Sequence, residues 1–314
     1  MKNLIVSTSP HIQTKKTTRT IMADVLIALA PAVIASVVLF GIRALFIILA
    51  CTVSSVLSEF VFNLLTKKEQ TVGDLSAVIT GVLLALSLPA TAPIWQCVIG
   101  SVFAIVVVKC LFGGIGCNFA NPAVTARVFL LLAFTEVGGG CATRFMTDIE
   151  AGATPLEVMK GGTVDGLPSL LDMFLGNRMG AIGETCAAAL ILGFIYLVIR
   201  RVIKWQVPVI FAATVFVLTL LIKQDVNLAV YQLLSGGLIL AAVFMATDYV
   251  TTPLNTAGKM VFSLGCGIIT VLIRLFGSYP GGVSFAILIM NILSPYIEKI
   301  TMKKPFGGKK NVKK

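Results

Sequence analysis

A short polar stretch between two apolar parts of the chain carries the side chain best placed for covalent chemistry. The stretch is Ala151-Gly152-Ala153-Thr154-Pro155, followed by Leu156. Its small residues leave room for a bulky group to approach the Thr154 hydroxyl, and Pro155 fixes the backbone beside it and disfavours helix just before it. The pattern predicts either an ordinary turn or a turn whose hydroxyl carries an esterified ligand.

Two other stretches place polar side chains next to helix-breaking residues. The first, residues 113–123, contains Asn118 and Asn121, and Pro122 suits the first turn of a helix that Asn121 would cap. The second, residues 246–253, contains Thr247, Asp248 and Thr251 and ends at a proline. Both stretches adjoin apolar blocks, so both are candidate ligand sites.

Two charged residues in these regions need an explanation. A charge within a bilayer costs several kcal/mol unless it is paired, solvated or at the boundary. Asp248 is therefore either a structural cap or part of a ligand site. Arg127, about a turn and a half beyond Asn121, is either a buried or snorkelling residue or part of such a site.

The composition indicates an integral membrane protein. Of 314 residues, 57% are hydrophobic and 12% are charged, and the mean hydropathy is +0.97. A helical span needs about 20 apolar residues. The chain has ten such blocks, at residues 21–40, 44–65, 75–90, 94–112, 120–136, 181–200, 207–222, 229–247, 259–276 and 280–298. We therefore predict an all-α membrane protein with about ten transmembrane helices.

The distribution of basic residues predicts the orientation of these spans. With the N-terminus in the cytoplasm, most lysines and arginines outside the spans, Lys109 among them, fall on the cytoplasmic side, as the positive-inside rule requires. Both termini are then cytoplasmic, and the loop 137–180 is external. The net charge of +11 reflects this topology and contact with membrane lipid, and does not indicate binding to nucleic acid.

A weak internal repeat is visible at a spacing of 164 residues. Shifting the chain by that distance places Pro89 on Pro253, and residues 111–113 on residues 275–277. Five spans in each half would give two repeats of opposite orientation, with ligand sites where spans are broken. The predicted regions are a cytoplasmic segment 1–20, a five-helix repeat 21–136, the external loop 137–180, a second repeat 181–298 and a basic tail 299–314.

The seven cysteines include no C-x-x-C pair, and we interpret them as small apolar residues. Cys110 and Cys117 flank a Gly-rich turn, but two thiols without partners make a poor cluster or metal site. No metal centre is predicted.

Taken over nearly its whole length, the chain resembles the NqrB/RnfD family. These are membrane subunits of the Rnf complex, an ion-translocating ferredoxin:NAD⁺ oxidoreductase, and of the Na⁺-translocating NADH:quinone reductase. The resemblance rests on residues 9–12 (Ser-Pro-His-Ile), 21–25, 28–32, 116–123, 152–156, 245–248 and Pro253.

The resemblance implies an electron carrier with FMN joined through its phosphate to Thr154. The motif neighbours are Gly152, Ala153, Pro155 and Leu156, whereas Ala151 stands where the family often has Ser. An FMN transferase would act on this external loop. The other Rnf subunits A, B, C, E and G would be partners, and the G flavoprotein among them would exchange electrons with this chain.

The resemblance also implies a second flavin and a coupled ion. Asn118 and Asn121 match an Asn-x-x-Asn-Pro segment beside a non-covalent riboflavin in the sodium-pumping relative. Asp248, with Thr247, Thr251 and Arg127, is the predicted site of coupling to Na⁺ or H⁺. The implied location is the bacterial cytoplasmic membrane.

Two other functional classes fit the residues alone. Broken helices in an inverted repeat are equally the plan of a secondary solute or ion transporter without a redox cofactor. A membrane scaffold is the third possibility. The classes differ in one property, a covalently held flavin on Thr154.

Overall fold

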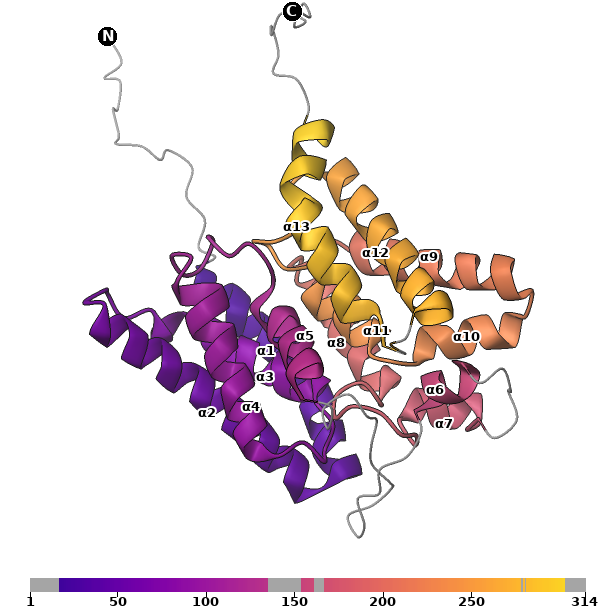
Figure 1. Ribbon diagram of the computed structural model, residues 1–314, viewed down its shortest axis with the longest axis horizontal. Coiled ribbons are helices and arrows are strands. Elements are labelled where there is room, and N and C mark those ends of the chain that lie inside the picture. The colour runs from indigo at the N-terminus through magenta and orange to yellow at the C-terminus, as the bar shows by residue number, and fades with distance from the viewer. Residues whose placement is uncertain (1–16, 135–153, 161–166, 278, 280, 303–314) are drawn as a thin grey trace, which may run out of the picture.

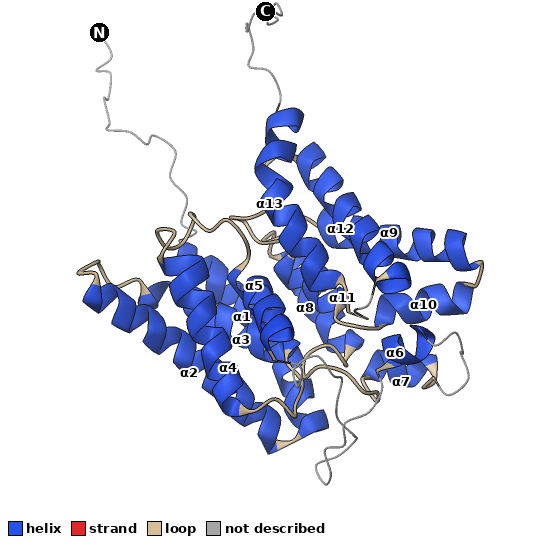
Figure 2. Ribbon diagram, in the orientation of Figure 1, coloured by secondary structure: helices blue, strands red, loops and turns tan. Residues whose placement is uncertain are grey.

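The computed structural model describes residues 17–134, 154–160, 167–277, 279 and 281–302. All elements of regular structure in these residues are helices (Figures 1 and 2). The all-α prediction is therefore confirmed for the described chain.

The first half begins with two long helices, and its later elements are shorter. α1 starts at Thr17, whose side chain forms a capping box with Thr20, and ends at Gly41, where a φ of 72° suits glycine. α2 packs against α3 and α4. The elements are α1 (Thr18–Phe40), α2 (Ile42–Leu65), η1 (Val72–Asp74), α3 (Ser76–Ser87), α4 (Ile94–Val102), the π-helix η2 (Phe103–Cys110) and α5 (Pro122–Ala133).

The second half follows two short helices, α6 (Pro155–Lys160) and α7 (Leu170–Leu175). Its elements are α8 (Ala187–Ile199), α9 (Gln206–Lys223), α10 (Val226–Leu234), α11 (Leu238–Leu240), the π-helix η4 (Ala241–Met245), α12 (Thr256–Phe276) and α13 (Val283–Thr301). The chain bends by 61° between α10 and the α11–η4 segment. Gly236 and Gly237 form this break with φ values of 64° and 63°, which favour glycine.

The described helices identify a multi-pass membrane protein. α1, α2, α9, α12 and α13 are each long and apolar enough to cross a membrane, and the bent α10–η4 pair is a sixth span if it counts as one. Four shorter apolar segments, α3, α4–η2, α5 and α8, occupy the remaining predicted blocks. The ten-span arrangement and the inverted repeat stay predictions.

One predicted block starts earlier than its helix. The block 181–200 is helical only from Ala187, because the preceding residues pair with the end of α3. The backbone N–H of Ile182 donates to the carbonyl of Leu88 at 2.9 Å, and that of Gly183 donates to Leu86 at 2.7 Å. This pairing carries the 176–186 segment into the interior.

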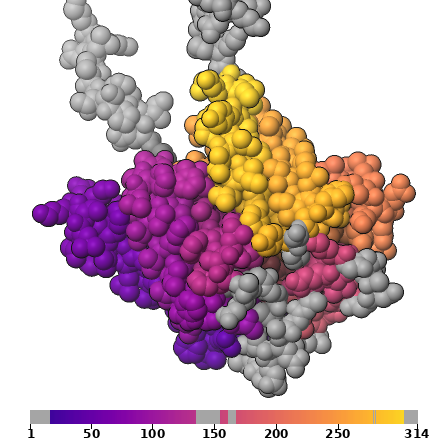
Figure 3. Space-filling view, viewed as in Figure 1, coloured from indigo at the N-terminus to yellow at the C-terminus, as the bar shows by residue number. Residues whose placement is uncertain are grey.

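The two halves are joined along α1–α8 and α5–α13. Arg200 pairs with Asp24 at 3.1 Å, and the Tyr196 hydroxyl donates to the same carboxylate at 3.1 Å. The packed surface of the α13 region against the first half is visible in Figure 3. In Figure 1, the start of α1 and the end of α13 lie toward one edge of the molecule, and α6 and α7 lie toward the other.

Candidate functional site

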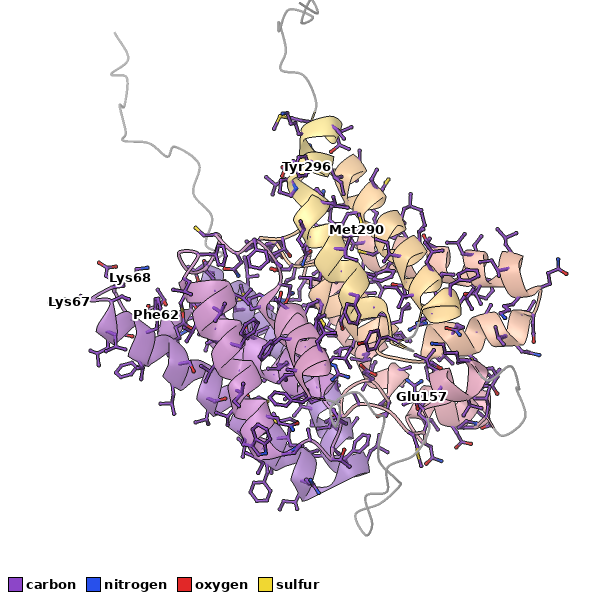
Figure 4. The ribbon with its side chains drawn as sticks, in the orientation of Figure 1. Phe62, Lys67, Lys68, Glu157, Met290 and Tyr296 are labelled. Carbon is purple, nitrogen blue, oxygen red and sulfur yellow. The ribbon has the colours of Figure 1, made fainter. Side chains whose placement is uncertain are left out.

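Thr154 is the residue that caps helix α6. Its backbone N–H donates to Glu157 Oε2 at 2.7 Å, and the Glu157 N–H donates to Thr154 Oγ1 at 3.3 Å. These reciprocal bonds form a capping box, for which Thr-x-x-Glu is the sequence signature. The non-helical conformation predicted for Thr154 is confirmed, whereas Ala151, Gly152 and Ala153 lie outside the described residues. Figure 4 labels Glu157 on α6.

The Thr154 segment lines the wall of an open cleft. The space between its walls, with the open mouth included, is about 1040 Å³. We call this space the Thr154 cleft. It is lined by Thr154, Pro155, Leu156 and Glu157, by Arg127 of α5, by Arg178 and Glu184, by α11 and η4, and by Tyr279 and Phe285.

The cleft is lined by charged side chains of both signs. Arg178 is buried, and its guanidinium donates to the carbonyls of Glu184 at 2.6 Å and Thr185 at 3.3 Å. Burial lowers the Arg178 pKa to about 10, with Glu184 opposing that shift, so this arginine is protonated at neutral pH. Arg127, Arg178 and Arg274 all stabilise the Glu184 carboxylate electrostatically. The lining itself holds two arginines and two glutamates, and Arg274 adds a third positive charge near Glu184 from outside the lining.

The floor of the cleft is the break between α10 and α11. Leu156 packs directly on Gly236, and Glu184 packs on Gly237, so a β-carbon at either glycine would collide with its neighbour. Arg274 of α12 holds the break by donating to the carbonyls of Gln232 at 2.6 Å and Ser235 at 3.0 Å. The Thr154 segment therefore contacts the broken helix at Gly236, and Glu184 contacts it at Gly237.

The other polar residues singled out from the sequence meet in a second cavity of about 800 Å³, between the two halves. We call it the Asn118 cavity, and Asn118, Asn121, Thr247 and Asp248 line it. Asn121 caps α5 as predicted, accepting from the N–H groups of Ala123 and Val124 at 3.0 and 3.3 Å. Its Nδ2 donates to the Met245 carbonyl at 3.2 Å.

Asn118 and Asp248 differ in how well their side chains are satisfied. Asn118 Oδ1 is buried without a hydrogen-bond partner among the described residues. Asp248 accepts from the Val250 N–H at 3.4 Å and the Thr251 hydroxyl at 3.1 Å. Thr247 instead donates to the Val243 carbonyl of its own helix at 2.6 Å. Asp248 thus caps its own turn while facing the cavity, and Asn118 retains an acceptor for a ligand.

Arg127 does not join the Asp248 group with which the sequence associated it. It lines the Thr154 cleft and is absent from the lining of the Asn118 cavity. The structure therefore separates the predicted residues into one set around Thr154 and another around Asp248.

Lys109, which lines the Asn118 cavity, belongs to a buried ion pair. Lys109 Nζ donates to Glu59 Oε1 at 2.8 Å, and the side chains are 2% and 1% exposed. Lys109 also donates to Ser76 Oγ at 2.5 Å, and the Thr71 hydroxyl donates to Glu59 Oε1 at 2.6 Å. Lys109 is therefore buried among protein partners, and its assignment to the cytoplasmic side of the membrane stays a prediction.

Three important residues were given little or no role at the sequence level. Arg178, Glu184 and Glu157 complete the Thr154 cleft. The Thr-x-x-Glu signature was sufficient to find Glu157. Nothing local signals Arg178 and Glu184, because the pairing of residues 182–183 with the end of α3 brings them to the cleft.

The chain is similar in sequence to a known family of proteins over most of its length. Residues 5–307 match the family described as the NQR2, RnfD, RnfE family. The chain is 46% identical over 307 residues to the D subunit of the Na⁺-translocating ferredoxin:NAD⁺ oxidoreductase complex of Acetobacterium woodii, covering 97% of this chain and 96% of the relative. It is 37% identical over 327 residues to the proton-translocating counterpart of Clostridium ljungdahlii, covering 98% of each chain. The D subunit of an ion-translocating oxidoreductase complex of Methanosarcina acetivorans is 33% identical over 312 residues, covering 99% of this chain and all of the relative.

Proposed function

Because the chain belongs to the NQR2, RnfD, RnfE family, we propose that it is the membrane flavoprotein subunit of an Rnf complex. In that role it passes electrons through FMN esterified to Thr154, as part of ferredoxin:NAD⁺ electron transfer coupled to translocation of Na⁺ or H⁺. The observation that carries the proposal is the position of Thr154 in the wall of a cleft beside Arg127 and buried Arg178.

The residues of the Thr154 cleft suit FMN. The protonated Arg178 and the neighbouring Arg127 would offset the charge of the phosphoester. Tyr279 and Phe285, with ring centroids 5.3 Å apart, offer apolar surface to an aromatic ring system. When bound, FMN supplies one- and two-electron redox chemistry that no side chain here can perform.

The chain is not a complete enzyme. It contains no Gly-rich nucleotide-binding βαβ unit and no cysteine cluster of the kind that holds iron and sulfur. Electrons must therefore come from and go to partners, for which we propose the other Rnf subunits A, B, C, E and G. The G flavoprotein would be the exchange partner, and an FMN transferase would load Thr154.

The topology we propose places the FMN on the outer side of a bacterial cytoplasmic membrane, with both chain termini inside. The location of α6 and α7 opposite the start of α1 and the end of α13 supports this orientation (Figure 1). The residues related by the 164-residue spacing also support the inverted repeat. Leu111 follows η2, and Leu275 lies in the last turn of α12, so both mark the ends of elements in corresponding positions.

Mass analysis of the wild-type chain tests the covalent proposal. The protein is purified from cells that also express the FMN transferase, run on a denaturing gel under ultraviolet light, and digested for peptide mapping. We expect a fluorescent band and an FMN-phosphoryl mass increment on the peptide containing Thr154. A dark band without the increment would instead favour a cofactor-free transporter or a scaffold.

The Asn118 cavity is the place we propose for a non-covalent riboflavin. It brings Asn118 and Asn121 together, and the buried Asn118 Oδ1, which has no partner among the described residues, is an acceptor for the polar edge of a flavin ring. Asn121 would contribute mainly by fixing the start of α5, because both ends of its amide already bond to backbone groups.

We also propose that Asp248 couples ion movement to electron transfer. Its carboxylate faces the Asn118 cavity beside Thr247, and Thr251 orients it. A negative charge in this setting attracts a cation, and reduction of a nearby flavin would strengthen that attraction. The named relatives include sodium- and proton-translocating complexes, so the proposed role of Asp248 fits either ion.

Asp248→Asn should reduce ion transport in vesicles at least about tenfold, the factor corresponding to about 1.4 kcal/mol. Asparagine can still accept from Thr251, so flavin attachment should stay at the wild-type level. The control is Asp225→Asn, because Asp225 caps α10 outside both cavities and asparagine caps equally well. Wild-type transport by Asp248→Asn would remove this carboxylate from the coupling mechanism.

A further inference from the structure

A third cavity, of about 1150 Å³, lies between the α8–α9 connection and the residues around the start of α12. Its cationic lining residues are Arg201, Lys204 and Lys259, accompanied by Trp205. None of the described residues that line it is acidic. We call it the basic cavity, and neither the FMN nor the ion-coupling proposal uses it.

Contacts between its two walls set the shape of the basic cavity. Lys204 Nζ donates to the Thr256 hydroxyl at 3.1 Å, and the Tyr249 hydroxyl donates to the Val202 carbonyl. Helices α9 and α12 both begin here, and neither has a side-chain cap. Their first backbone N–H groups add partial positive charge to that of the three side chains.

This arrangement of positive charges favours an anionic ligand in the basic cavity. A small cation entering here would meet three positive groups without a carboxylate to compensate them, whereas a phosphate would be attracted by all three. The basic cavity also shares Val202, Ile203, Thr247 and Tyr249 with the Asn118 cavity. The three basic residues would therefore repel a cation that entered through the basic cavity to reach Asp248. An anion bound in the basic cavity would lie beside the Asn118 cavity.

The surroundings point to a lipid as the source of the phosphate. Ile199, Trp205 and Val209 are exposed apolar side chains near the cavity, with exposed fractions of 73%, 55% and 43%. Tryptophan is enriched where membrane meets water, and basic pockets at helix ends on the cytoplasmic side bind anionic headgroups. Arg201 and Lys204 belong to the loop that the charge distribution places on that side.

We propose that the basic cavity binds the phosphate group of an anionic phospholipid. Arg201, Lys204 and Lys259 hold the headgroup, and the acyl chains lie along Ile199, Trp205 and Val209. The site is independent of the flavin on Thr154, so the presence or absence of FMN does not decide it.

The test measures lipid binding to the purified full-length protein. Native mass spectrometry in neutral detergent follows the titration of phosphatidylglycerol, with phosphatidylcholine as the neutral lipid and glycerol 3-phosphate as the free phosphate ester. The variant is Lys204→Gln/Lys259→Gln. The matched control is Lys67→Gln/Lys68→Gln, which removes two exposed lysines at the far end of α2 (Figure 4).

We expect phosphatidylglycerol to bind at least about tenfold more weakly to the Lys204/Lys259 variant, and to bind the Lys67/Lys68 control like the wild type. Equal binding by all three proteins, an equal loss in the control, or equal binding of phosphatidylcholine would overturn the site. Displacement of the lipid by equimolar glycerol 3-phosphate would overturn its assignment to lipid. If the Lys204/Lys259 variant unfolds, the exposed residue Arg201 is replaced instead. Arg201→Gln should also weaken phosphatidylglycerol binding.

Discussion

Thr154→Ala should yield a folded membrane protein that carries no covalent flavin, and ferredoxin-dependent NAD⁺ reduction should fall to the level of membranes lacking the complex. Only the hydroxyl oxygen of Thr154 can form the proposed phosphoester at this position. Its loss as a helix cap costs about 1 kcal/mol, and α6 is a short peripheral helix. The loss of activity should therefore exceed any loss of protein.

The measurement compares in-gel flavin fluorescence, intact mass and membrane NAD⁺ reduction at equal amounts of the complex. Thr214→Ala is the matched control, because the Thr214 hydroxyl donates to the Ile210 carbonyl of its own helix at 2.7 Å and lines neither cavity. A flavin increment that persists in Thr154→Ala would place the ester on another residue. Full NAD⁺ reduction without the increment would show that electrons do not need this cofactor.

Lys109→Met should be among the most destabilising single changes in the chain. Lys109 neutralises Glu59 where both side chains are buried, and Glu59 Oε2 already lacks a hydrogen-bond partner among the described residues. Removing one member of a buried pair leaves an uncompensated charge, which costs about 3–5 kcal/mol. We expect a large fall in the midpoint of thermal unfolding in detergent and in the amount of protein recovered from membranes.

The double variant Lys109→Met/Glu59→Gln distinguishes a loss of stability caused by the uncompensated charge from one caused by altered side-chain packing. Replacing both partners removes the uncompensated charge, and such replacements are often close to neutral. Most of the lost thermal stability should therefore return. If the single variant is as stable as the wild type, or if the double variant is no better than the single one, the buried pair is not what stabilises this region.

The sequence was sufficient where local chemistry decides the structure. Asn121 before Pro122 predicted a capped helix start, which the hydrogen bonds to Ala123 and Val124 confirm. Pro155 correctly indicated that Thr154 is not helical, whereas the short helix that begins at Pro155 was not predicted. The apolar blocks predicted the class of protein, because hydropathy is a local property.

The sequence was insufficient where the position of a side chain depends on packing between elements that are distant in the chain. Arg127 was grouped with Asp248 because both are charged residues in or near apolar spans, and it lies six residues beyond Asn121 on the same helix. Six residues move it about 9 Å along the axis and well around the helix, where it faces a different cavity. Lys109 was counted only by its charge, because its partner Glu59 comes from another helix. Neither α5 nor η2 alone indicates those neighbours.

Helix η4 lies between the Thr154 cleft and the Asn118 cavity and contributes side chains to both. Met245 and Ala241 face the Thr154 cleft, whereas Val243 and Phe244 face the Asn118 cavity. A helix with its side chains is about 10–12 Å thick. At that separation and an effective dielectric constant near 20, one unit charge changes the energy of another by about 1–2 kcal/mol. Occupancy on one side of this helix would thus tune the midpoint potential of a redox group on the other, without any movement of the backbone.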